Sequence, residues 1–110
     1  MNRLLQGDVG SGKTVVAASA MLMAATAGAQ AALMAPTEIL AEQHYQGLSK
    51  LLTPLGITVC LLTGSTPAAE KARIYAELAD GTIHVAIGTH ALIQAGGQFH
   101  KLALSVIDER

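Results

Sequence analysis

Short apolar runs alternate with longer, mixed segments along this chain. The apolar runs have strand length, and the best of them, "ITVCLL", is rich in β-branched residues. The strands that we expect are 3–6, 31–35, 57–62, 83–88 and 102–108. The mixed segments are rich in helix formers, and the helices that we expect are 12–27, 38–52 and 67–80. Strands that alternate with helices in this way predict a parallel α/β sheet.

Polar and small residues mark where these helices begin and end. Thr37 can cap the second helix. Thr66 is a plausible cap for the third, with Pro67 at its first helical position. Gly28 and Gly81 follow the first and third helices, where glycine commonly stops a helix. The sequence therefore predicts well-defined elements joined by short turns.

The composition narrows the class of protein. The chain has 110 residues, of which 51% are hydrophobic, 14% are charged and 3% are aromatic, with much of the apolar share alanine. This predicts one domain in which small helices pack closely on a sheet. A net charge of −1 gives no general basic surface for nucleic acid. Cys60 is a single cysteine in an apolar run, so we expect a reduced core thiol.

An uncharged stretch, 15–37, has the length of a membrane span. It is mainly alanine and is interrupted by Gly28 and Pro36, so a helix followed by a buried strand explains it better. No basic-then-apolar signal peptide precedes it. We therefore expect a cytoplasmic protein that does not enter a membrane.

The segment "GDVGSGKT", residues 7–14, matches the phosphate-binding pattern G-x-x-x-x-G-K-[ST]. Glycines allow backbone N–H groups to approach phosphate oxygens, and the following helix adds its positive N-terminal end. Lys13 can reach the β- and γ-phosphates, and the Thr14 hydroxyl can bind Mg²⁺. The expected nucleotide-binding residues are Gly7, Gly10, Ser11, Gly12, Lys13 and Thr14. The alternative is a glycine-rich turn that matches by chance.

An acidic pair follows the last strand. Asp108 and Glu109 come at its carboxyl end, which in parallel sheets is the edge where ligands bind. There Asp108 can share Mg²⁺ with Thr14, and Glu109 can polarise the attacking water as a general base. An ordinary acidic loop is the alternative. Together with the phosphate loop, the pair predicts hydrolysis of a nucleoside triphosphate, with Lys13, Asp108 and Glu109 as catalytic residues.

Three further motifs, "APTEILAEQH", "LLTGS" and "IGTHALIQ", each follow a predicted strand. With "GDVGSGKT" and "VIDE" they resemble, over essentially the whole chain, the first motor domain of superfamily 2 helicases and translocases. The resemblance is strongest to the group that remodels stalled forks and branched DNA. It implies a RecA-like P-loop NTPase fold with three layers, ATP and Mg²⁺ as cofactors, and DNA as partner. The implied DNA-binding residues are Pro36, Thr37, Gly64, Ser65, Thr89 and His90.

Such DNA contacts make physical sense without a basic patch. Hydroxyls and free N–H groups at strand ends and helix starts bind phosphate without reading bases. Thr37 and Ser65 are also ordinary helix caps, and capping alone is the competing interpretation. Lys71, Arg73 and Lys101 are most simply solvated surface charges. The four histidines lack metal-ligand spacing such as H-E-x-x-H.

Other functions fit parts of the pattern. A transcription-repair coupling translocase has a similar motor. A nucleotide-dependent switch or a kinase-type phosphoryl transferase also uses a phosphate loop, but does not need the acidic pair and the further motor motifs. A non-catalytic remnant is a third class.

The sequence departs from the helicase pattern at its end. Arg110 follows Asp108 and Glu109 where glutamine is usual, and the next histidine of the motif is missing. A later strand that lies between the phosphate-loop strand and the acidic strand is missing too, as are a second motor domain and a DNA-branch domain. We therefore expect the N-terminal part of a first motor domain, truncated at both ends, with apolar sheet edges left exposed. Alone, it should neither hydrolyse ATP efficiently nor unwind DNA.

Overall fold

The expected parallel α/β architecture is present in the computed structural model, which describes residues 11–94 and 99–107. Four strands form one parallel sheet in the order β2-β3-β1-β4. The strands are β1 (Gln30–Met34), β2 (Val59–Leu62), β3 (Val85–Gly88) and β4 (Leu102–Ile107). The helices are α1 (Ser11–Thr26), α2 (Glu38–Leu52), α3 (Ala68–Ala79) and α4 (Ala91–Gln94), with a 3-10 turn at Thr53–Leu55. Every described strand was expected, whereas α4 was not.

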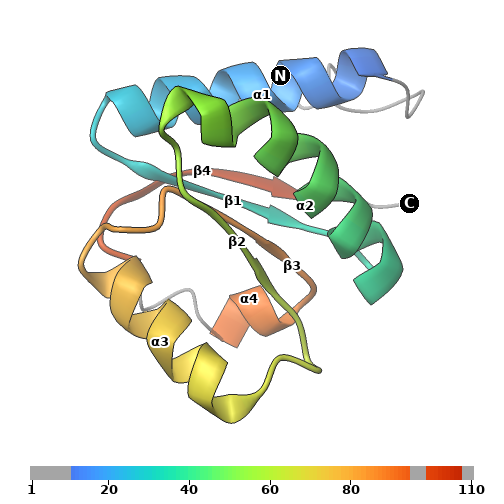
Figure 1. Ribbon diagram of the computed structural model, residues 1–110, viewed down its shortest axis with the longest axis vertical. Helices are drawn as coiled ribbons and strands as arrows, with labels where there is room; N and C mark the ends of the chain where they lie inside the picture. The colour runs from blue at the N-terminus through green and yellow to red at the C-terminus, as the bar shows by residue number, and fades with distance from the viewer. Residues whose placement is uncertain (1–10, 95–98, 108–110) are drawn as a thin grey trace.

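Helices cover both faces of the sheet, which gives three layers. Helices α1 and α2 lie on one face, and α3 and α4 lie on the other (Figure 1). Successive strand residues point to opposite faces, so Leu33 and Ile87 pack under α1 and α2 while Ala32 and Ala86 pack toward α3 and α4. The alanines on the sheet and in α1 keep these layers close.

The helix boundaries follow the predicted residues at Gly28, Thr37 and Gly81 but not at Thr66. The Thr37 hydroxyl accepts a hydrogen bond from the Leu40 N–H at 3.2 Å, so Thr37 caps α2 as expected. Gly81 adopts φ +85, the left-handed conformation that ends α3 without strain. The Thr66 cap was wrong: Pro67 occupies the cap position of α3, and the Thr66 hydroxyl instead accepts from the Thr63 N–H at 3.0 Å.

One buried side chain ties the amino ends of the strands together. The Gln30 amide donates to the carbonyls of Leu78 (3.0 Å) and Ile83 (2.7 Å). Its oxygen accepts from the Lys101 N–H at 2.8 Å. Because Gln30 is 3% exposed, these bonds join β1, the end of α3 and the start of β4 away from water.

Strand β4 is the least covered strand that the structure describes. It pairs with β1, and in the described part of the chain nothing pairs with its other side. Leu102 is 42% exposed and Ile107 is 59% exposed. Apolar side chains therefore reach solvent along this edge.

Candidate nucleic-acid interface

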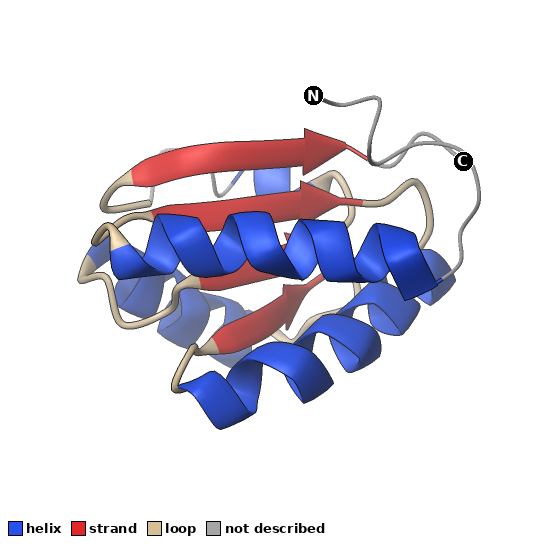
Figure 2. Ribbon diagram, turned by 90° about the horizontal axis from the view of Figure 1, so that it is seen from above, coloured by secondary structure: helices blue, strands red, loops and turns tan. Residues whose placement is uncertain are grey.

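The carboxyl ends of all four strands lie at one edge of the sheet, where the arrowheads of Figure 2 are found. Five of the six predicted DNA-binding residues line one cavity of about 270 Å³ at this edge. They come from the ends of three strands: Pro36 and Thr37 after β1, Gly64 after β2, and Thr89 and His90 after β3. Segments far apart in the sequence thus converge on one site.

The residues predicted to bind the triphosphate lie largely outside the described residues. This holds for Gly7, Gly10, Asp108 and Glu109, and for the side chains at 11–14. The structure describes a helix from Ser11 onward and a strand that ends at Ile107. The roles of the phosphate loop and the acidic pair therefore remain predictions.

Thr37 presents a hydroxyl at the mouth of the cavity. Its oxygen accepts the Leu40 N–H, and the residue is exposed in an extended conformation, with φ −134 and ψ 160. A hydroxyl that accepts one bond keeps its own hydrogen to donate. Capping and phosphate binding are therefore compatible at this residue.

The turn after β2 is held by hydrogen bonds among its own residues. The Thr63 hydroxyl lies 3.1 Å from the Ser65 hydroxyl and accepts from the Ser65 N–H at 3.3 Å. The Ser65 hydroxyl donates to the Glu38 carboxylate at 3.0 Å. Ser65 is the one predicted DNA-binding residue that does not line the cavity. Its bond to Glu38 fixes the turn against the first turn of α2, and that places Gly64 at the cavity wall.

The end of β3 requires a glycine. A Cβ added to Gly88 would lie 1.8 Å from the Leu62 carbonyl oxygen. The close approach lets the Thr89 N–H donate to Leu62 O at 3.3 Å and the Ala35 N–H donate to Gly88 O at 2.8 Å. Gly88 thus draws together the three strand ends that form the cavity.

Thr89 and His90 differ in access to solvent. Thr89 is 5% exposed, and its carbonyl accepts from the Leu92 N–H at 2.9 Å, which opens α4. His90 is exposed. Thr89 therefore lines the cavity from within, and His90 stands at its rim.

Lys71 also lines this cavity, which the sequence interpretation missed when it treated Lys71 as a solvated surface charge. The spacing of residues along α3 indicates this position. Lys71 precedes the buried Ile74 by three residues and the buried Leu78 by seven, so it lies on the core-facing stripe of α3. Glu38 lines the cavity too, and so one lysine ammonium and one carboxylate face the same space.

Cys60 was expected in the core, and the structure places it half-buried against the core cluster on the α3 side of the sheet. Burial raises its pKa from 9.0 to about 12, with smaller opposing effects of Arg73 and Glu77. The thiol is neutral at ordinary pH and is not a nucleophile. Within 11–94 and 99–107, no three His, Cys, Asp or Glu side chains could hold a metal ion together. No helix in those ranges is long and apolar enough to cross a membrane.

Comparison with known proteins identifies the family. A family model described as DEAD/DEAH box helicase matches residues 1–110. Two curated relatives, both named ATP-dependent DNA helicase RecG, come from Streptococcus pneumoniae and a Synechocystis species. They are 59% and 57% identical over the whole chain, which covers 16% and 13% of their lengths.

Two solved structures share the fold. One, described as RecG bound to a three-way DNA junction, has a TM-score of 0.88 and 54% identity over 100% of this chain and 15% of that one. The other is the Mycobacterium smegmatis helicase Lhr bound to ssDNA and AMP-PNP, with a TM-score of 0.64 and 13% identity over 94% of this chain and 18% of that one. The fold is that of a RecA-like helicase domain, as expected.

Proposed function

This chain belongs to the DEAD/DEAH box helicase family, and on that basis we propose that it forms the N-terminal part of the first motor domain of a RecG-type DNA helicase. The whole protein would couple ATP hydrolysis to the remodelling of branched DNA, in the cytoplasm. The observation that carries this proposal is the convergence of three strand ends, with five predicted DNA-binding residues, on one cavity.

The nucleotide site in this proposal combines the two ends of the chain. Lys13 binds the β- and γ-phosphates, and the backbone of Gly7, Gly10, Ser11 and Gly12 surrounds them. Thr14 and Asp108 would hold Mg²⁺, which would neutralise phosphate charge when bound. Glu109 orients and deprotonates the attacking water. In support, β4 is hydrogen-bonded to β1 as far as Ile107, and the acidic pair follows Ile107 directly in the sequence.

The DNA site uses groups that recognise phosphate rather than bases. Thr37 donates its hydroxyl hydrogen, Gly64 offers backbone without a side chain, and His90 and Lys71 bring donors to the rim and wall of the cavity. Ser65 acts through Glu38, which it holds by a 3.0 Å hydrogen bond. Such contacts track a DNA backbone of any sequence, and this fits a chain whose net charge is −1.

A chimera tests this function. Residues 1–110 replace the matching segment of the Streptococcus pneumoniae relative, which is 59% identical. We expect ATP hydrolysis that rises on addition of a three-way DNA junction and is lost in Lys13→Ala, because the phosphates lose their cation. Lys50→Gln, on the exposed last turn of α2, is the control and should match the unaltered chimera. Hydrolysis that is indifferent to DNA would overturn the proposal.

A further inference from the structure

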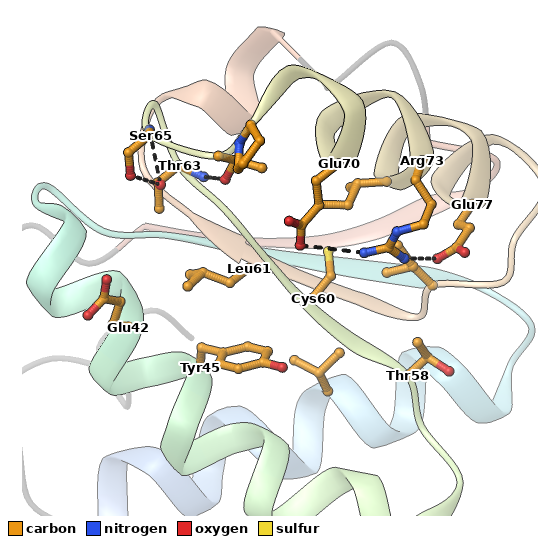
Figure 3. A pocket seen from close by; sticks show the side chains of 15 residues that line it. Glu42, Tyr45, Thr58, Cys60, Leu61, Thr63, Ser65, Glu70, Arg73 and Glu77 are labelled. Atoms are coloured by element: carbon orange, nitrogen blue, oxygen red, sulfur yellow. Dashed lines mark hydrogen bonds and ion pairs between the residues drawn. The ribbon is translucent and has the colours of Figure 1, made fainter.

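A second cavity, of about 400 Å³, runs along the outer edge of β2 between α2 and α3. Figure 3 shows Leu61 and Tyr45 on the α2 side of the strand and the Cys60 sulfur directed toward α3. Strand β2 is the last strand in the sheet order, and among the described residues no strand lies beyond it. The cavity is therefore a groove whose floor is an unpaired strand edge.

The backbone of β2 offers hydrogen-bonding groups to this groove. The carbonyls of Thr58 and Leu62 accept from the N–H groups of Val85 (3.0 Å) and Thr89 (3.3 Å), so these two residues face β3. In a parallel ladder the residues that face a given neighbour alternate. Val59 and Leu61 therefore direct both their N–H and their C=O groups outward, into the groove.

The groove closes at one end. The Thr63 N–H, which continues the outward row, is already donated to the Thr66 hydroxyl at 3.0 Å. Backbone pairing is thus limited to the span from Val59 to Leu61. An occupant needs only a short extended stretch, and its side chains must alternate between the α2 wall and the α3 wall.

The walls of the groove are acidic. Glu42 lies on the α2 side, and Glu70 and Glu77 lie on the α3 side. Arg73 is the one cation among the lining residues, and it bridges Glu70 at 3.6 Å and Glu77 at 3.1 Å. Three carboxylates against one guanidinium leave the groove with a formal charge of −2.

We propose that the outer edge of β2 receives an extended, basic segment of a partner protein, which adds to the sheet as a strand and sets its lysines or arginines against Glu42, Glu70 and Glu77. Main-chain bonds to Val59 and Leu61 supply pairing, and the carboxylates supply selectivity. A second copy of this chain fits less well, since its own β2 brings the same three carboxylates to the contact. A nucleic acid strand also fits less well, since its phosphates would face the three carboxylates of the groove.

The probe is an acetylated and amidated peptide that alternates valine with arginine and lysine, and its matched control carries glutamate in place of the basic residues. Binding is measured by fluorescence anisotropy and by chemical shifts, both to the 110-residue chain and to the chimera described above. We expect the basic peptide to bind both and the acidic peptide to bind neither. Equal affinity for the two peptides would overturn the proposal.

N-methylation of the peptide tests strand addition directly. In an added strand, every second peptide N–H faces β2, and methylation of these nitrogens blocks donation to the Val59 and Leu61 carbonyls. The remaining N–H groups point away from β2. We expect one methylated peptide to lose roughly tenfold or more in affinity and the other to retain it. Equal effects of the two methylation patterns would show that the peptide does not pair with the strand.

Charge variants test the walls. Glu42→Gln should weaken binding of the basic peptide roughly threefold, and Arg73→Gln should tighten it by a similar factor because Glu70 and Glu77 are freed. Gln46→Lys on the exposed side of α2 raises the net charge by one, as Glu42→Gln does, but lies outside the groove. It should leave affinity unchanged. A dimer of the chain that seals the β2 edge, or equal effects of Glu42→Gln and Gln46→Lys, would contradict the proposal.

Discussion

The two ends of the parallel strands use their polar groups in opposite ways. At the amino ends, Gln30 places both its amide nitrogen and its oxygen in buried hydrogen bonds, and the His84 Nδ1 accepts from the Thr58 N–H at 2.9 Å. At the carboxyl ends, Thr37 and His90 are exposed beside an open cavity. Both edges of the sheet thus hold the strands together, and the carboxyl edge in addition leaves exposed polar side chains beside a cavity.

The largest expected effect comes from Gly88→Ala. The new Cβ would meet the Leu62 carbonyl, so the ends of β2 and β3 must separate, at a cost of about 3 kcal/mol or more in the free energy of unfolding. Gly64→Ala is the matched control, because its nearest contact is an ordinary 3.8 Å. Urea denaturation of both variants measures the difference. Equal stabilities would show that the strand ends are not tightly joined.

Gln30→Leu tests the amino end. The substitution removes the partner of the Ile83 carbonyl and of the Lys101 N–H, whereas the Leu78 carbonyl still accepts from the His100 backbone N–H. The two groups left unpaired should cost about 2–4 kcal/mol of stability. DNA binding by the folded fraction should be unchanged. Gln46→Leu, at an exposed site on α2, should have little effect on the unfolding midpoint. A loss of DNA affinity without a loss of stability in Gln30→Leu would reverse the roles assigned to the two ends.

Lys71→Gln tests the carboxyl end. In the chimera we expect DNA affinity to fall roughly threefold and the slope of log affinity against log salt to shrink by about one phosphate contact, with stability unaltered. Lys50→Gln is the control, since that lysine is exposed and lies away from the cavity. A salt slope that is the same for both variants would remove Lys71 from the DNA site.

Cys60 gives the smallest effect, and it depends on pH. Its pKa in the folded chain is about 12, above the 9.0 of the free thiol. The folded state therefore favours the neutral thiol, so its contribution to stability is full below pH 9 and declines as the pH rises toward 12. Alkylation by iodoacetamide at pH 8 should be slow until urea unfolds the chain. Rapid alkylation of the folded chain would show that the fold does not raise the pKa of this thiol.

Local signals in the sequence predicted most of the fold. Each described strand was predicted from its short apolar run, and the start of α2 was predicted from the Thr37 cap. Helix α4 has four residues, too few to show a helical period. The Thr66 prediction failed because the same hydroxyl can bond backward to Thr63, and sequence alone does not rank the two bonds.

The sequence indicated candidate residues within single motifs, but it did not indicate contacts between residues that are far apart in the sequence. The family resemblance implied Pro36, Thr37, Gly64, Thr89 and His90, and the structure places these residues around one cavity. Their contact with DNA stays a prediction. Gln30 escaped notice because its partners lie 48, 53 and 71 residues away. Ser65 stays a predicted DNA-binding residue, and the sequence did not show that its hydroxyl is donated to Glu38, a residue of another motif. Such pairings depend on the packing of the sheet and helices.

Photo-crosslinking from two exposed histidines tests whether DNA binds at the carboxyl ends of the strands. His90 lines the cavity at the carboxyl ends of the strands. His100 precedes β4 at the amino ends of the strands, where its backbone N–H donates to the Leu78 carbonyl at 2.9 Å. Each is replaced in turn by benzoylphenylalanine in the chimera, which is then irradiated with a labelled three-way DNA junction. We expect crosslinked DNA from position 90 and none above background from position 100. Crosslinks of equal yield from both positions, or from position 100 alone, would contradict this expectation.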